Sequence, residues 1–138
     1  MIRTAFAHWE GNLKEGNGIL TTQSGVLENT AYSYKARFKE GIKQTNPEEL
    51  LAAAHAGCFT MAVSAQLTLK GITPSKLDTT ATLTMNDLGI VSIHLKILGA
   101  VPNISAEEFA TITKDVEQNC FISKVLNIPI TSEVHFEF

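Results

Sequence analysis

Two cysteines are the residues of this 138-residue sequence best suited to chemistry. Cys58 lies in the middle of the apolar stretch "TNPEELLAAAHAGCFTMAVSAQL", and Cys120 lies in "NCFISKVL", where a helix is expected to begin. Free backbone amides and the helix dipole at such a start favour a thiolate. Two thiols can form a sulfenic acid and then a disulfide. A cysteine in an alanine-rich helix can equally be an inert small apolar residue, and the spacing leaves both interpretations open.

Two glutamates stand near the start of the same stretch. Asn46 is a good helix N-cap, so Glu49 occupies the third helical position and is expected to complete a capping box. Glu48 has no such duty and is free to hold an arginine, which binds a carboxylate through two parallel hydrogen bonds. Arg37 is expected on the polar face of the strand that precedes the helix. Glu48 and Cys58 are about 15 Å apart along a straight helix, so a bend, a long arginine side chain or a second subunit must bridge them.

His55 lies three residues before Cys58 on the same helical face. A Cys–His couple for acyl transfer would also need an orienting acid and an oxyanion hole. Two ligands do not make a zinc site, and the sequence has no CxxC or HxxxH motif. We therefore expect a helix histidine satisfied by a neighbouring group, and no metal.

The bulk composition excludes several function classes. The net charge is −3 and the pI is about 5.8, whereas binding nucleic acid needs a basic surface. The N-terminus has no signal-peptide pattern, which predicts a cytoplasmic protein. The run from Leu50 to Leu69 is long enough to consider for a membrane, but it contains His55, Ser64 and Gln66. A buried helix of a soluble protein is the expected outcome, with no membrane partner.

The pattern of strands and helices predicts one α+β domain over residues 1–138. Three strands are expected in "RTAFAHWEG", "NGILTTQSG" and "TAYSYKARFKE", followed by a long helix that Gly71 closes. Two strands, "LDTTATLTM" and "IVSIHLKILGAV", flank the turn "NDLG". A helix capped by Ser105 runs to about Gln118, a short helical turn follows, and "IPITSEVHFEF" is the last strand. The long helix is apolar all round and needs cover on every side, which predicts a homodimer.

Four separated segments together resemble one known family. The stretch "TNPEELLAAAHAGCFTMAVS" resembles the signature helix of the OsmC/Ohr family, the osmotically inducible and organic hydroperoxide resistance proteins. The segments "AHWEGNLKEGNG" and "SGVLENTAYSYKARF" resemble the OsmC branch in particular, and "NCFISKVLNIPIT" resembles the second cysteine segment of the family. The resemblance covers essentially the whole chain, in the same element order.

The resemblance implies an α+β fold in which two small antiparallel sheets surround a long central helix in an intertwined homodimer. It implies a thiol-dependent peroxidase for organic hydroperoxides. Such an enzyme uses no cofactor and no metal, and an external dithiol reduces it after each cycle. By match, Cys58 is the peroxidatic cysteine and Cys120 the resolving one, while Arg37 and Glu48 activate the thiolate. Members commonly carry proline after the second cysteine, where this chain has Phe121, so the sequence beside Cys120 departs from the family pattern while the thiol itself is present.

Two other functions stay open at this point. One is a non-catalytic ligand-binding stress dimer, in which both cysteines are core residues and react slowly with any peroxide. The other is a Cys–His hydrolase that uses Cys58 and His55. The apolar neighbours Phe59 and Met61 lead us to expect a peroxide with a carbon tail to be a better substrate than hydrogen peroxide.

Overall fold

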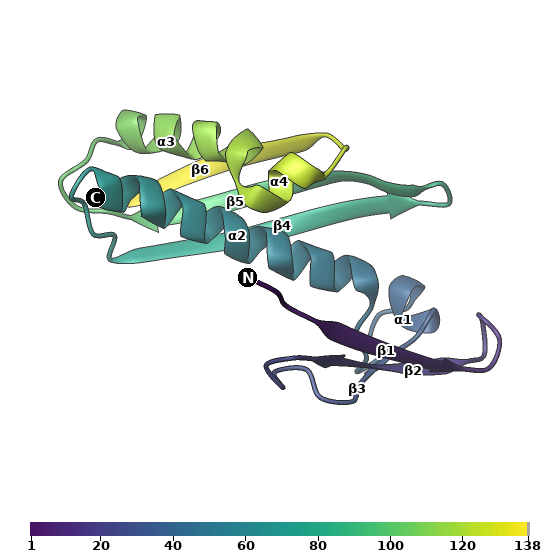
Figure 1. The fold of residues 1–138 in the computed structure, drawn as a ribbon. Coiled ribbons are helices and arrows are strands. Elements are labelled where there is room, and N and C mark those ends of the chain that lie inside the picture. Colours follow the sequence, from purple (N-terminus) through teal and green to yellow (C-terminus); the bar gives the residue numbers. More distant parts are fainter. Residues whose placement is uncertain (138) are drawn as a thin grey trace. The chain divides into compact units, whose positions relative to one another are not determined.

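A computed structural model describes residues 1–137, and the chain divides into two compact units, of which the first is Met1–Leu50. This unit holds an antiparallel sheet in the order β1-β2-β3, formed by Ala5–Glu10, Asn17–Thr22 and Thr30–Tyr32 (Figure 1). Gly18 on β2 lies between the rings of Trp9 and Tyr32, and a Cβ there would come within 2.7 Å of Trp9 and 2.3 Å of Tyr32. Glycine therefore allows the two rings to pack across the sheet, 5.5 Å apart.

The prediction that the third strand continues through Arg37 is wrong beyond Tyr32, where β3 ends. The chain turns there into a short helix, α1, at Lys35–Phe38. The Ser33 hydroxyl oxygen accepts a hydrogen bond of 3.2 Å from the Ala36 amide, a local bond that draws serine toward turns and helix starts. Arg37 is therefore carried by a helical turn and not by the polar face of a strand.

The long helix α2 spans Pro47–Leu69. Its predicted N-cap is confirmed, because Asn46 Oδ1 accepts a hydrogen bond of 2.8 Å from the Glu49 amide. The predicted capping box is wrong in its second half: the Glu49 carboxylate accepts from the Thr45 hydroxyl at 2.9 Å. Gly71 closes the helix at a φ of 73°, as expected, where an L side chain would be strained.

The second unit begins at Leu51 and contains a sheet in the order β4-β5-β6. Its strands are Lys76–Asn86, Gly89–Ala100 and Ile130–Glu137, and its further helices are α3 at Ala106–Asn119 and α4 at Phe121–Val125. Strands β4 and β5 are antiparallel, but β5 and β6 are parallel, so the expectation of a purely antiparallel second sheet is wrong. The connection through α3 and α4 explains this, because parallel neighbours need a long crossover. The α+β class is confirmed.

Helix α2 buries only one stripe of its surface, formed by His55, Phe59, Val63 and Leu67 at four-residue spacing. This stripe joins a core to which β5 contributes alternate residues and α3 contributes Phe109. In Figure 1, α2 and α3 run alongside the sheet that contains β5. Other apolar side chains of the helix stay uncovered, including Met61 at 75% exposure and Leu69 at 80%. The helix is also long and apolar enough to cross a membrane, a property that the core helices of soluble proteins share.

Candidate functional site

The predicted pairing of Arg37 with Glu48 is present. Arg37 Nη2 lies 2.9 Å from Glu48 Oε1, and Arg37 Nε donates to Glu48 Oε2 at 3.1 Å. The two side chains are 29% and 14% exposed, so this two-handed ion pair is more shielded from water than an ordinary surface pair. Helix α1 supplies the arginine and the first turn of α2 supplies the glutamate. Glu48 therefore fixes the position of the guanidinium group.

The Arg37 side chain borders an open pocket of about 280 Å³ in the first unit. The aromatic rings of Trp9, Tyr32 and Tyr34 line much of the pocket. Leu13, Ser33 and Pro47 complete its lining. The guanidinium carbon of Arg37 lies 5.9 Å from the centre of the Tyr34 ring, within the range of a cation–π contact. The pocket thus joins one fixed positive charge to an apolar lining, which suits a small molecule with a polar end and a carbon tail.

Both cysteines belong to the second unit and both are free thiols. Cys58 on α2 is half-buried, whereas Cys120 is only 2% exposed. The neighbours expected to shape an apolar pocket at Cys58 do not do so together, because Phe59 is fully buried in the core and Met61 points to the surface. Cys58 is therefore the more accessible thiol, and Cys120 is enclosed by protein.

Cys120 ends α3 and forms the N-cap of α4, which confirms the expected helix start. Its sulfur lies 3.0 Å from the Ser123 hydroxyl and accepts a hydrogen bond of 3.4 Å from the Ser123 amide. The Ser123 hydroxyl in turn lies 2.8 Å from Nε2 of the fully buried His55. The expectation that a neighbouring group satisfies His55 is confirmed for Nε2, whose hydrogen bond goes to Ser123 rather than to Cys58, whereas Nδ1 has no partner within residues 1–137.

Ser123 is the residue of this group that sequence reasoning missed. A serine three residues after a capping residue could have been noticed, since that position donates its amide to the cap. The partner of Ser123 could not have been found in this way, because His55 lies 68 residues away in the chain.

Burial lowers the pKa of His55 from its ordinary value of 6.5. Below that pH the unfolded chain binds a proton that the folded chain refuses, so acid favours unfolding. We expect the free energy of unfolding to fall as the pH drops from about 7 to about 5, by up to about 1.4 kcal/mol per pH unit from this one group. Urea titrations at several pH values would measure the slope.

The variant His55→Gln should flatten this dependence, because glutamine keeps a polar side chain and does not titrate. His8→Gln is the matched control, since His8 lies on β1 with a side chain that is 50% exposed. An unchanged slope in His55→Gln, or the same flattening in both variants, would contradict the assignment.

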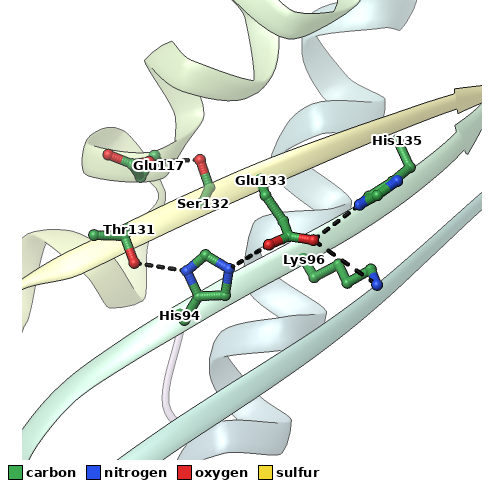
Figure 2. Close-up of polar contacts among 7 residues, drawn as sticks. All are labelled: His94, Lys96, Glu117, Thr131, Ser132, Glu133 and His135. Atoms are coloured by element: carbon green, nitrogen blue, oxygen red, sulfur yellow. Dashed lines mark hydrogen bonds and ion pairs between the residues drawn. The ribbon is translucent and has the colours of Figure 1, made fainter.

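Two further polar clusters lie beside strand β6, and Figure 2 shows the first together with Glu117 and Ser132 of the second. On the outer face of the sheet, Glu133 accepts hydrogen bonds from His135 at 2.8 Å and His94 at 3.1 Å, which hold the pKa of Glu133 below its ordinary value. On the helix side, burial pushes the pKa of Glu117 upward, but hydrogen bonds from Lys114, Ser132 and Gln118 outweigh it and the net pKa is lowered. Within residues 1–137, no group of three or more His, Cys, Asp or Glu side chains is arranged to hold a metal ion.

The chain is similar to known proteins over most of its length. The family model described as OsmC-like protein matches residues 39–135. Peroxiredoxin OsmC of Escherichia coli (strain K12) is 47% identical over 129 residues, which cover 91% of this chain and 90% of that protein, and peroxiredoxin OsmC of Shigella flexneri matches equally well. This identity supports the OsmC branch.

Solved structures agree in fold. The OsmC-like protein of Mycoplasma pneumoniae superposes with a TM-score of 0.75 at 18% identity, covering 100% of this chain and 99% of that one. An organic hydroperoxide resistance protein from Elizabethkingia anophelis gives a TM-score of 0.73 at 23% identity, with 99% of each chain covered. On the family match and the identity over most of its length, this chain belongs to the OsmC-like family.

Proposed function

We propose that the chain is a cysteine-based peroxidase that reduces organic hydroperoxides to alcohols. The observation that carries the proposal is the 47% identity to a peroxiredoxin over 91% of this chain. The residues present suit the chemistry: one half-buried thiol, one enclosed thiol and a guanidinium group held by a carboxylate.

In the proposed cycle Cys58 attacks first, because it is the more accessible thiol. A guanidinium group favours the thiolate form by its positive charge. The thiolate sulfur attacks the peroxide O–O bond, and the departing alkoxide is stabilised by Arg37 and takes up a proton to become the alcohol. Cys58 is left as a sulfenic acid. Cys120 then displaces its oxygen as water and closes a disulfide, which an external dithiol reduces by exchange.

The pocket beside Arg37 supports an organic substrate. Its aromatic lining of Trp9, Tyr32 and Tyr34 offers apolar surface for a carbon tail, whereas hydrogen peroxide has no group to bury there. We therefore propose this pocket, rather than Phe59 and Met61, as the source of a preference for organic hydroperoxides.

The proposal includes a homodimer, a dithiol reductant and a reducing cytoplasm. The uncovered apolar side of α2, with Met61 and Leu69 largely exposed, supports the dimer because an isolated chain would leave this surface in water. The two free cysteines suit a compartment in which disulfides are transient. Light scattering of the purified chain tests the dimer.

The test of the function is stoichiometric. Reduced protein is mixed with one equivalent of cumene hydroperoxide, and separately of hydrogen peroxide, and free thiols and intact mass are followed with time. We expect rapid loss of both thiols and a mass lower by two hydrogens, faster with the organic peroxide. Cys58→Ser should not react, and Cys120→Ser should stop at the sulfenic acid with one equivalent and be overoxidised when a second equivalent is added.

Other outcomes identify the rival functions. Reaction no faster than in Cys58→Ser would leave a non-catalytic ligand-binding protein. Hydrolysis of an activated ester that His55→Ala abolishes and Cys120→Ser leaves intact would indicate a Cys–His hydrolase. The hydrogen bond of His55 to Ser123 gives that hydrolase no support, because it directs the imidazole Nε2 to Ser123.

A further inference from the structure

The buried trio His55, Ser123 and Cys120 includes two residues, His55 and Ser123, that have no role in the proposed cycle. Its three side chains come from α2, α4 and the junction of α3 with α4, and all three are buried. The contacts form an unbroken line from Nε2 of His55 through the Ser123 hydroxyl to the Cys120 sulfur, at 2.8 Å and 3.0 Å. Buried polar side chains that end on a reacting atom are candidates for a direct part in the reaction.

The unpaired nitrogen of His55 determines which atom donates and which accepts in each of these two hydrogen bonds. Nδ1 is buried and has no hydrogen-bond partner among residues 1–137. A buried N–H without an acceptor is strongly disfavoured, so the neutral ring carries its proton on Nε2. Burial lowers the pKa of His55 and keeps the ring neutral. Nε2–H therefore donates to the Ser123 oxygen, and the Ser123 hydroxyl hydrogen is left to point at the sulfur.

The Cys120 sulfur consequently faces two donors, the hydroxyl and the backbone amide of Ser123. Hydrogen bonds to the charged form of a group favour that form, which opposes the effect of burial on a thiolate. Within residues 1–137, the buried carboxylate of neighbouring α3 is Glu117, which Lys114, Gln118 and Ser132 hold. On α4, Lys124 is exposed, and on β5 and β6 the hydrogen-bonded pair His94 and Glu133 lies on the outer face.

We propose that Ser123 and His55 stabilise the form of the Cys120 sulfur that closes the disulfide, with Ser123 donating directly to the sulfur and His55 acting as a positioning residue. This inference rests on the proposed peroxidase function. The Cys120 sulfur attacks the sulfenic sulfur of Cys58, the S–S bond forms, and the S–O bond breaks. Its electron pair leaves with the oxygen as hydroxide, which takes a proton from solvent and becomes water. Cys120 is oxidised and Cys58 is reduced to the disulfide level.

The first experiment does not depend on peroxide. In Cys58→Ser protein Cys120 is the remaining thiol of the sequence, so the ultraviolet absorbance of the thiolate reports this residue alone. We expect Ser123→Ala and His55→Ala to lower the thiolate fraction at about pH 8, by up to roughly tenfold for the loss of one hydrogen bond to a charged group. Ser123→Thr restores the hydroxyl and should restore the signal.

His55→Gln separates positioning from other roles. Glutamine places an uncharged N–H donor close to the position of Nε2 and cannot take up a proton. The thiolate fraction should therefore return to the parent value in His55→Gln. Ser92→Ala is the matched control, because Ser92 alternates with the buried residues of β5 and faces away from the core. Circular dichroism of each variant confirms that it is folded.

The second experiment uses the complete protein and one equivalent of cumene hydroperoxide. Sulfenic acid formation at Cys58 is trapped with dimedone, and disulfide closure is measured in the same samples by quenched mass spectrometry. Closure relative to sulfenic acid formation should slow by roughly tenfold in Ser123→Ala and recover in Ser123→Thr.

Unchanged thiolate absorbance and unchanged closure in folded Ser123→Ala would overturn the inference. A thiolate signal lost in folded His55→Gln would overturn the positioning role of His55. If the parent forms no sulfenic acid, the peroxidase function itself fails, and the absorbance experiment shows separately whether Ser123 and His55 stabilise the thiolate.

Discussion

Replacing Arg37 with methionine should slow the oxidation of Cys58 by cumene hydroperoxide by about a hundred- to a thousandfold. In the proposed mechanism the guanidinium group acts twice, because it favours the attacking thiolate and stabilises the departing alkoxide. Methionine fills similar space without charge. The rate is measured by stopped-flow fluorescence or by quenched thiol counting at several peroxide concentrations.

Glu48 acts through the arginine, so its removal should matter less. Glu48→Gln keeps the shape of the side chain and loses the charge, and we expect a loss of roughly tenfold, as for one charge-assisted hydrogen bond. Arg37→Lys should also be impaired, since an ammonium group cannot reproduce the contacts of Nε and Nη2 with the carboxylate.

Lys35 provides the matched control for both variants. It lies on the same short helix α1, carries the same charge, and pairs with Glu15 at 3.3 Å on the exposed surface. Lys35→Met should leave the oxidation rate within a factor of two or so, because exposed ion pairs contribute little. Parent-like oxidation in Arg37→Met, or an equal loss in Lys35→Met, would remove Arg37 from the mechanism.

Replacing Phe109 with alanine should lower the free energy of unfolding by about 3–5 kcal/mol. Phe109 is fully buried in the second unit and its ring centre lies 5.5 Å from that of Phe136. It also rests on Gly99 of β5, where a Cβ would come within 2.3 Å of the ring. Gly99→Ala should therefore destabilise by about 1–3 kcal/mol through overpacking.

The double variant tests whether these two effects have one cause. With the ring absent, the added methyl group of Gly99→Ala fills part of the cavity, so the second substitution should cost little in the Phe109→Ala background. Urea unfolding of the four proteins gives the coupling energy. Additive losses would mean that the ring and Gly99 do not oppose each other in the folded state.

Much of the fold could be predicted where local pattern and tertiary environment agree. Strands β4 and β5 alternate apolar and polar residues, and their ends lie within two residues of the predicted ones. Asn46 caps α2, and Ser105 caps α3 by accepting from the Glu108 amide at 3.1 Å. The pairing of Arg37 with Glu48 could be predicted because the capping arrangement left Glu48 without a partner.

The errors lie where one local bond or a distant contact decides the structure. A strand pattern continues through Phe38, but the Ser33 hydroxyl accepts a hydrogen bond from the Ala36 amide in the helical turn that ends the strand. The parallel pairing of β6 depends on the crossover through α3 and α4, which strand periodicity does not report. The contact of His55 with Ser123 joins α2 to α4, two helices whose contacting residues are 68 positions apart in the sequence. No local spacing of residues predicts such a contact.

The parallel placement of β6 beside β5 also has a consequence for how fast the chain folds. Strands β4 and β5 meet across the tight turn between Asn86 and Gly89 and can form early. In contrast, Ile130 finds its partner Ile93 only after the intervening helices have condensed. That search carries the entropy of closing a long loop. The docking of β6 should therefore be the slow folding step of this unit, and until it occurs one hydrogen-bonding edge of β5 stays open to pairing with other chains.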